Sequence, residues 1–195
     1  MILKDILLIN HPNAPHNGRL HTKAKSMNRN FNTNTKNHDE WLTPPYIIES
    51  LGKFDLDPCA PIDSTRPWDT ALRHYTLEDD GGLNKAWHGR VWCNPPYGRQ
   101  TFDWLDKLAD HGNGIALIFS RTETIGFHRS VWNKADSVFF FKGRLKFHRI
   151  DGTKADTANA PSCLIAYGHD NTLSIKRAMS SGKITGHLVA NETED

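Results

Sequence analysis

The stretch "VWCNPPYG", residues 91–98, places a short apolar run directly before an amide, two prolines and an aromatic ring. The apolar run predicts a buried strand, and the prolines end it because they cannot donate to a sheet ladder. On both sides of this stretch, short apolar runs alternate with helical spacing of apolar residues. We expect strands at 53–57, 90–93, 114–120 and 136–143, and helices at 101–110 and 124–135. This alternation predicts an α/β fold with a doubly wound, mostly parallel sheet.

The C-terminal part of the sheet is expected to be antiparallel. Residues 144–149 ("RLKFHR") and 162–168 ("SCLIAYG") both read as strands, and they flank the polar stretch 150–161. Two strand runs that a polar loop separates predict a hairpin. The expected sheet therefore ends in an antiparallel C-terminal hairpin.

One domain is expected between two tails. A chain of 195 residues, 37% of them hydrophobic, is long enough for a single core. Residues 1–38 hold few aliphatic side chains and predict a disordered basic tail, in which Met27 is an alternative translation start. We expect the catalytic or binding domain at 39–170, and a C-terminal tail at 171–195 with a short helix near 173–180.

Charge and cysteine content exclude several classes of protein. The formal net charge is only +2, so the local placement of charge must decide whether the partner is anionic. The three cysteines form no C-x-x-C pair and the histidines show no metal spacing, so we expect no disulfide framework and no metal site. Reduced thiols, the absence of a run long enough to span a membrane and a poor signal peptide predict a cytoplasmic protein. The sequence leaves the oligomeric state open, and a monomer is compatible with it.

The Asn-Pro-Pro-Tyr loop has the chemistry of a receptor for an amino group. Proline keeps its carbonyl while losing its N–H, so the Asn94 side-chain oxygen and the Pro95 carbonyl can accept the two hydrogens of an NH2 group. Pro96 stiffens the loop, and Tyr97 can stack on a planar target. Two such acceptors would favour a pyramidal nitrogen as it attacks an electrophile, which stabilises the transition state. The alternative is a tight turn after a strand, with Tyr97 capping the core.

The chain resembles the phage and prophage DNA N-6-adenine methyltransferase family (Dam-type), within the amino-methyltransferases whose motif is [DNS]-P-P-[YFW]. The resemblance extends over residues 39–168 in ordered blocks. They read "EWLTPPYII" (40–48), "FDLDPCA" (54–60), "DGGLNKAW" (80–87), "VWCNPPYG" (91–98), "ALIFSRTET" (116–124), "GRLKF" (143–147) and "APSCLIAYG" (160–168). The family implies a Rossmann-like methyltransferase sheet, S-adenosylmethionine as cofactor and adenine in DNA as substrate.

By this resemblance, the turn after the first strand belongs to the cofactor site. Asp55 or Asp57 would approach the polar parts of the cofactor, and Pro58, Cys59 and Ala60 would let the backbone come close. The block lacks the glycine-rich loop common in methyltransferases, so the identity of the contacting atoms stays open. A strand that ends in an Asx turn is the alternative.

Two further blocks resemble cofactor-binding segments of the family. Asp80 would bind the adenine of the cofactor, or it caps the helical-looking segment that follows it. Trp41, Thr43 and Pro44 match the N-terminal cofactor block, or they are an anchoring tryptophan and a Pro-Pro turn. Asn94 would also face the cofactor.

DNA would be held by basic residues near the strand ends. An enzyme that acts on a base in a duplex must flip it out and needs positive charge for the backbone. Lys142, Arg144 and Lys146 would share one face of a strand, and Arg99 and Arg121 lie just past other strand ends. A solvated, charged edge strand is the alternative.

The expected activity is methylation of adenine N6 in DNA, in phage or prophage DNA modification that protects against restriction, within the host cytoplasm. Similar Pro-Pro loops serve cytosine N4, RNA bases and protein amides. A catalytically silent nucleic-acid-binding module of the same fold is the alternative from another class.

Overall fold

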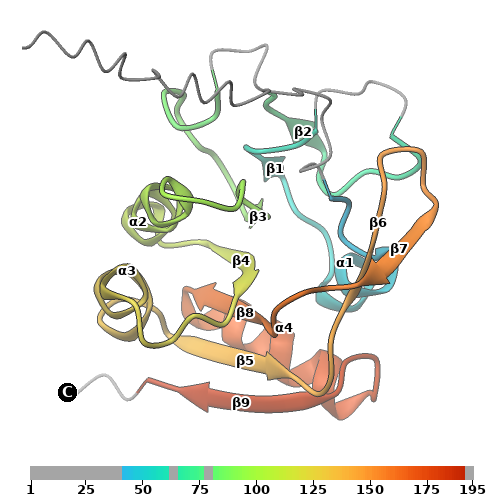
Figure 1. The fold of residues 1–195 in the computed structure, drawn as a ribbon. Helices are drawn as coiled ribbons and strands as arrows, with labels where there is room; N and C mark the ends of the chain where they lie inside the picture. Colours follow the sequence, from blue (N-terminus) through green and yellow to red (C-terminus); the bar gives the residue numbers. More distant parts are fainter. Residues whose placement is uncertain (1–40, 62–65, 77–80, 192–195) are drawn as a thin grey trace, which may run out of the picture. The chain divides into compact units, whose positions relative to one another are not determined.

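The computed structural model describes residues 41–61, 66–76 and 81–191. Seven strands form one sheet in the order β2-β1-β3-β4-β8-β5-β9 (Figure 1). The strands are β1 Leu56–Asp57, β2 Arg73–His74, β3 Val91–Cys93, β4 Gly114–Phe119, β5 Ser137–Phe141, β8 Ser162–Tyr167 and β9 Gly186–Ala190. The pairs among β2, β1, β3 and β4 are parallel, and the pairs β4–β8, β8–β5 and β5–β9 are antiparallel. The chain is thus a mixed α/β protein in which β8 and β9 run against the other strands.

Strand β8 corrects the hairpin that we expected between 144–149 and 162–168. All of its residues, "SCLIAY", are buried, and it lies inside the main sheet between β4 and β5. The segment that includes 144–149 instead forms β6 (Lys146–His148), which pairs with β7 (Lys154–Thr157) in a separate two-stranded sheet. A strand that is apolar on both faces needs two neighbours, whereas the polar β7 suits an exposed ribbon.

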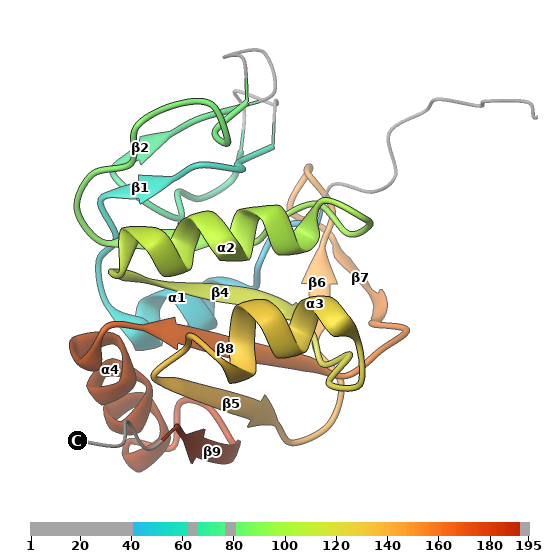
Figure 2. The same cartoon turned by 90° about the vertical axis from the view of Figure 1, so that its left-hand side faces the viewer.

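Helices cover both faces of the main sheet (Figure 1). Helices α1 (Pro45–Leu51) and α4 (His169–Ser180) lie on one face. Helix α2 (Thr101–His111), the short α3 (Ile125–Phe127) and the π-helical turn η2 (His128–Trp132) lie on the other. Figure 2 shows α2 and α3 side by side in front of the sheet. The result is a three-layer sandwich.

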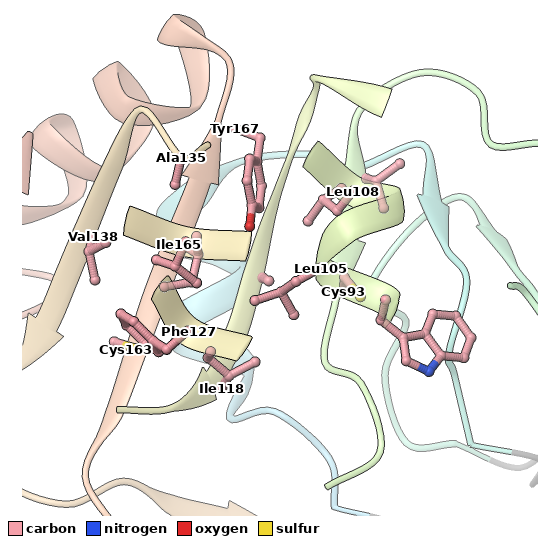
Figure 3. Close-up of a cluster of buried hydrophobic side chains, with 14 of the residues drawn as sticks. Cys93, Leu105, Leu108, Ile118, Phe127, Ala135, Val138, Cys163, Ile165 and Tyr167 are labelled. Carbon is pink, nitrogen blue, oxygen red and sulfur yellow. The ribbon is translucent and has the colours of Figure 1, made fainter. Parts of the chain in front are cut away.

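Each face of the sheet has its own apolar core, because successive strand residues point to opposite faces. In β3, Trp92 packs toward α1 and α4, whereas Val91 and Cys93 pack toward α2. Figure 3 shows the second core, in which Leu105 and Leu108 of α2 meet side chains of the sheet and of α3. Burying one such side chain stabilises the fold by roughly 1.5–3 kcal/mol.

Helix α2 confirms the helix expected at 101–110. Trp104, Leu105 and Leu108 are buried at helical spacing. The helix ends at Gly112, whose φ of 73° lies in the left-handed region that glycine adopts without strain. The helix expected at 124–135 is divided between α3 and η2.

Residues 81–87 do not form the helix that their sequence pattern indicates. They form a turn-rich loop, because tertiary contacts hold its carbonyls in place. The Lys107 ammonium of α2 donates to the carbonyls of Gly82, Leu83 and Lys85 at 3.2, 2.6 and 2.5 Å. The Trp87 indole donates to the Gly82 carbonyl at 2.7 Å.

Residues 171–190, expected as part of a tail, belong to the folded unit. The helix expected near 173–180 lies within α4, and β9 pairs with β5 over Ser137↔Ala190 to Phe141↔Gly186. The tail expected at 1–38 lies outside the described residues.

Candidate active site

Two loops meet at the carboxyl edge of the sheet, where parallel strands bind ligands in open α/β folds. The turn Asp57–Ala60 follows β1, and the loop Asn94–Gly98 follows the neighbouring strand β3. The sulfur atoms of Cys59 and Cys93 lie 3.7 Å apart, so the turn after β1 contacts the end of β3, directly before the motif loop. Burial raises the pKa of the Cys59 thiol well above its ordinary value, and the nearby Cys93 thiol raises it further. The Cys59 thiol is therefore a neutral packing partner rather than a nucleophile.

The side-chain amide of Asn94 has a fixed orientation. Its Nδ2 donates to the main-chain carbonyl of Trp41 at 3.1 Å. Because a carbonyl can only accept, this bond decides which end of the amide is nitrogen. The Asn94 Oδ1 atom is buried and has no hydrogen-bond partner among residues 41–61, 66–76 and 81–191, so within this part of the chain it is an acceptor with unfilled hydrogen-bonding capacity.

Thr101, the first residue of α2, holds the Pro-Pro loop. Its hydroxyl donates to the Pro96 carbonyl at 2.8 Å and accepts from the Gly98 N–H at 3.1 Å. Gly98 has a φ of 144°, which a side chain would strain. Pro95 is buried and Pro96 exposed. Sequence reasoning missed Thr101, although a threonine that opens a helix after a loop is a common capping signal.

Tyr97 is stacked rather than free. Its ring lies parallel to the Phe119 ring, with centroids 4.2 Å apart and an interplanar angle of 4°. Phe119 ends β4, the neighbour of β3, and was not among the expected site residues. The phenol oxygen of Tyr97 is buried without a partner, and burial raises its pKa, so the side chain is neutral at physiological pH. One face of the ring is thus covered by Phe119.

Of the two aspartates that the sequence leaves open, Asp57 lies at the carboxyl edge. Its carboxylate accepts from the Thr70 hydroxyl at 2.5 Å and from the Cys59 N–H at 3.1 Å. Burial raises the pKa of Asp57 despite these bonds. Asp55 instead accepts the Arg90 N–H at 2.7 Å, just before β3, and so lies at the opposite edge of the sheet. The structure brings Asp57 to the motif loop and places Asp55 away from it.

The turn after β1 also contacts the loop 81–87. A Cβ at Gly82 would stand 2.0 Å from the Pro58 carbonyl, so only glycine allows this approach. Ala60 is buried, and its N–H donates to the Tyr75 carbonyl at 3.0 Å. Asp80 lies outside the described residues.

The segment 41–44 runs beside the motif loop. Pro44 is buried and precedes α1, and Thr43 is 1% exposed with a hydroxyl that has no protein partner. Leu42 exchanges two backbone hydrogen bonds with His148 of β6, at 2.8 and 3.0 Å. The structure therefore joins this segment to the motif loop through the bond between the Trp41 carbonyl and Asn94, and the cofactor role expected for Trp41, Thr43 and Pro44 stays a prediction.

The expected DNA-binding residues are all exposed but do not share one strand. Arg99 and Arg121 follow β3 and β4 at the carboxyl edge. Lys142 follows β5, and Lys146 lies in β6. Gly143 lies between them with a φ of 84°, which is not an extended conformation, so no single strand runs from Lys142 to Lys146. The shared strand face expected for Lys142, Arg144 and Lys146 therefore does not form. The arrowheads of β1, β2 and β5 in Figure 2 point to the side on which β6 and β7 lie.

Within the described ranges, no group of three or more His, Cys, Asp or Glu side chains is arranged to hold a metal ion. Over the same ranges, no helix is both long and apolar enough to cross a membrane.

Comparison with known proteins gives one match. The model of a family described as DNA N-6-adenine-methyltransferase (Dam) matches residues 30–180. No curated protein and no solved structure matches the chain.

Proposed function

Because the chain belongs to the DNA N-6-adenine-methyltransferase (Dam) family, we propose that it transfers a methyl group from S-adenosylmethionine to N6 of an adenine flipped out of DNA. The observation that carries the proposal is the orientation of Asn94. Its Nδ2 is bonded to the Trp41 carbonyl, and its Oδ1 is buried and unpartnered at the carboxyl edge of the sheet. An amino group with two hydrogens is the partner that this acceptor lacks.

The loop acts on the reacting nitrogen through its acceptors. An exocyclic amine is a poor nucleophile because its lone pair is delocalised into the ring. Asn94 Oδ1 and the Pro95 carbonyl would each accept a hydrogen bond from one of its two N–H groups. These two bonds favour the pyramidal nitrogen of the transition state. Thr101 holds the adjacent Pro96 carbonyl at 2.8 Å, so the acceptors keep their positions during the reaction.

Tyr97 holds the flipped base by stacking. Phe119 covers one face of its ring, so the base stacks on the other. The parallel arrangement of the two rings fixes the plane in which the base must lie. A neutral phenol suits this role, because it adds no charge to an apolar contact.

The residues around the loop fit a polar cofactor. In the part of the chain that the structure describes, Thr43 Oγ1 and Asn94 Oδ1 are buried polar atoms without partners, and such atoms are normally satisfied. Trp41, Thr43, Pro44, the turn Asp57–Ala60 and Asp80 would hold S-adenosylmethionine. The cofactor supplies an electrophilic sulfonium methyl group when it is bound. We do not include Asp55 in this proposed cofactor site, because it lies at the opposite edge of the sheet.

Basic side chains at the same edge would hold the DNA backbone. Arg99, Arg121, Lys142, Arg144 and Lys146 are exposed, and lysine and arginine bind phosphates by charge. We propose further that the sheet belongs to the Rossmann-like methyltransferases, and that the enzyme modifies phage or prophage DNA against restriction.

The first test is incubation of the protein with tritiated S-adenosylmethionine and unmethylated duplex DNA, followed by nucleoside analysis. The expected product is N6-methyl-2′-deoxyadenosine, with Asn94→Ala protein as the matched control that loses most turnover. Tyr97→Ala should also lose most turnover while binding the cofactor almost normally. Label in cytosine, or in no nucleoside although the cofactor binds, would overturn the proposed substrate. Wild-type turnover by Asn94→Ala would overturn the proposed role of the loop.

A further inference from the structure

The carbonyl that orients Asn94 belongs to a buried segment that lies outside the main sheet, in which Leu42 is 3% and Thr43 1% exposed. Residues 41–43 precede α1 and pair with no strand of the main sheet, and Leu42 forms only an isolated bridge to His148. The Trp41 carbonyl shares one planar peptide unit with the Leu42 N–H, which donates to the His148 carbonyl at 2.8 Å, so the direction of this carbonyl depends on how His148 and the segment 41–43 are held.

Trp68 supplies a second fixed point, because it contacts both the segment and His148. Its indole Nε1 donates to the Thr43 carbonyl at 3.1 Å, two residues beyond the carbonyl that Asn94 binds. The indole is itself placed by its edge-on contact with the His148 ring, with centroids 5.1 Å apart. His148 also forms both backbone bonds to Leu42. A continuous series of contacts thus connects Trp68 and His148 with the segment 41–43 and, through the Trp41 carbonyl, with the Asn94 amide.

We propose that Trp68 is a positioning residue for methyl transfer: through the Thr43 carbonyl it fixes the segment whose Trp41 carbonyl orients the Asn94 amide. The inference rests on the proposed function. Trp68 does not need to touch the base or the cofactor. Its contribution is that Asn94 presents oxygen, rather than nitrogen, to the incoming amine.

The physical basis is the symmetry of an amide. Rotation by 180° about its last side-chain bond exchanges the oxygen and nitrogen of Asn94 with little change in shape. The flipped amide would present hydrogens to the hydrogens of the target amine, which cannot bond. The Trp41 carbonyl distinguishes the two orientations of the Asn94 amide, because it can bond only to the nitrogen end. A residue that fixes this carbonyl therefore favours the orientation with the oxygen toward the amine.

Trp68→Phe tests the inference, because it removes the indole N–H and keeps an aromatic ring against His148. The matched control is Trp132→Phe, which shortens a half-buried tryptophan on the opposite face of the sheet, packed against Phe127 at 5.2 Å. Two readouts are needed for each variant. One is the single-turnover methylation rate with saturating cofactor and DNA, and the other is the pair of Asn94 side-chain NH2 signals in NMR of 15N-asparagine-labelled protein, assigned by their absence in Asn94→Ala.

We expect Trp68→Phe to lower the single-turnover rate about tenfold, the effect of one lost neutral hydrogen bond, at an unchanged KM for DNA. Its Asn94 NH2 signals should shift and exchange with water faster, whereas Trp132→Phe leaves rate and signals unchanged. Thermal melting of both variants shows whether a change comes from unfolding.

Unchanged Asn94 signals in Trp68→Phe would overturn the inference, whatever the rate. Changed signals with a wild-type rate would overturn it as well, because orientation would then not limit methyl transfer. If wild-type protein methylates no adenine, the proposed function fails, and the NMR signals still show whether Trp68 orients Asn94.

Discussion

At the scale of single residues, the choice of asparagine at position 94 follows from its surroundings. The Trp41 carbonyl requires a donor, and the proposed amine requires an acceptor. An amide offers both on one short side chain, with the donor and the acceptor on two separate atoms. An ionised aspartate offers two acceptors and leaves the Trp41 carbonyl facing a like partial charge.

Asn94→Asp should therefore lower the single-turnover rate by about tenfold or more near pH 8, where the new carboxylate is ionised. The protonated acid can donate to the Trp41 carbonyl and keep its other oxygen as acceptor. The gap to wild type should then narrow as the pH is lowered toward about 6. The pH profile of methylation checks this, with the exposed Asn133→Asp as control. Equal activity of Asn94→Asp at every pH would contradict the role of the Trp41 carbonyl.

A second residue-scale prediction concerns the carboxyl group of Asp57. Burial raises its pKa, while the bonds from Thr70 and Cys59 lower it by less. Protonated Asp57 thus stabilises the fold fully below the ordinary pKa of about 3.9, and this contribution is lost as the pH rises through the higher folded-state pKa. Asp57→Asn lacks this titration. The stability of wild type relative to Asp57→Asn, measured by urea unfolding, should accordingly fall as the pH rises above the ordinary pKa of about 3.9. A relative gain for wild type over this range would show that hydrogen bonding outweighs burial.

At the scale of elements, the site depends on loops that other elements hold in place. The loop 81–87 has no regular secondary structure, yet it packs against Pro58 so closely that Gly82 admits no side chain. Three carbonyl bonds from Lys107 tie it to α2. Helix α2 thereby supports both the Pro-Pro loop, through Thr101, and the turn after β1, through this loop.

Lys107→Met should loosen the loop and weaken S-adenosylmethionine binding about tenfold, because charge-assisted hydrogen bonds contribute about 1.5–3 kcal/mol each and part of that energy positions the cofactor turn. Titration calorimetry measures the change. The matched control is Lys134→Met, whose ammonium forms only exposed ion pairs with Asp106 and Asp110 at 3.2 and 3.6 Å. Such pairs contribute little. Equal cofactor affinity in both variants would separate the loop 81–87 from the cofactor site.

These elements also show what the sequence can predict. Apolar runs located β3, β4 and β5, and helical spacing located α2, because local patterns follow from burial on one or both faces. The partner of β8 depends on tertiary structure instead. Its two buried faces require two neighbours, and that requirement, read from "SCLIAY", argues against the hairpin. The loop 81–87 lacks a helix for a related reason, since its carbonyls bind Lys107 rather than one another.

At the scale of the whole molecule, the site is assembled from segments far apart in the chain. The Trp41 carbonyl accepts a hydrogen bond from Asn94, and the Tyr97 ring stacks on Phe119. The sequence indicated the motif loop and the segment 41–44 as site candidates, because their residue types resemble those of one family, and the structure shows them joined through the Trp41 carbonyl and Asn94. It could not show which aspartate lies at the carboxyl edge, nor that a backbone carbonyl orients Asn94, because a carbonyl leaves no trace in residue type. Trp68, Thr101 and Phe119 were missed since their roles depend on contacts rather than on motifs.

The last prediction concerns how the molecule holds DNA. If the carboxyl edge is the DNA-binding face, charges there should contribute to affinity and charges at the opposite edge should not. Lys142 and Lys146 lie at the carboxyl edge, whereas Lys53 and Lys134 precede β1 and β5 at the amino edge. Each phosphate contact changes the slope of log K against log salt by about 0.9.

The double variant Lys142→Gln with Lys146→Gln should therefore bind a duplex more weakly at low salt, with a slope shallower by up to roughly 1.8 for two lost contacts. The matched double variant Lys53→Gln with Lys134→Gln removes the same net charge and should keep the wild-type slope. Fluorescence anisotropy over a salt series compares the two. Because both double variants change the net charge equally, a difference between their salt slopes shows that DNA contacts the carboxyl edge. Identical slopes would place the DNA on another face of the molecule.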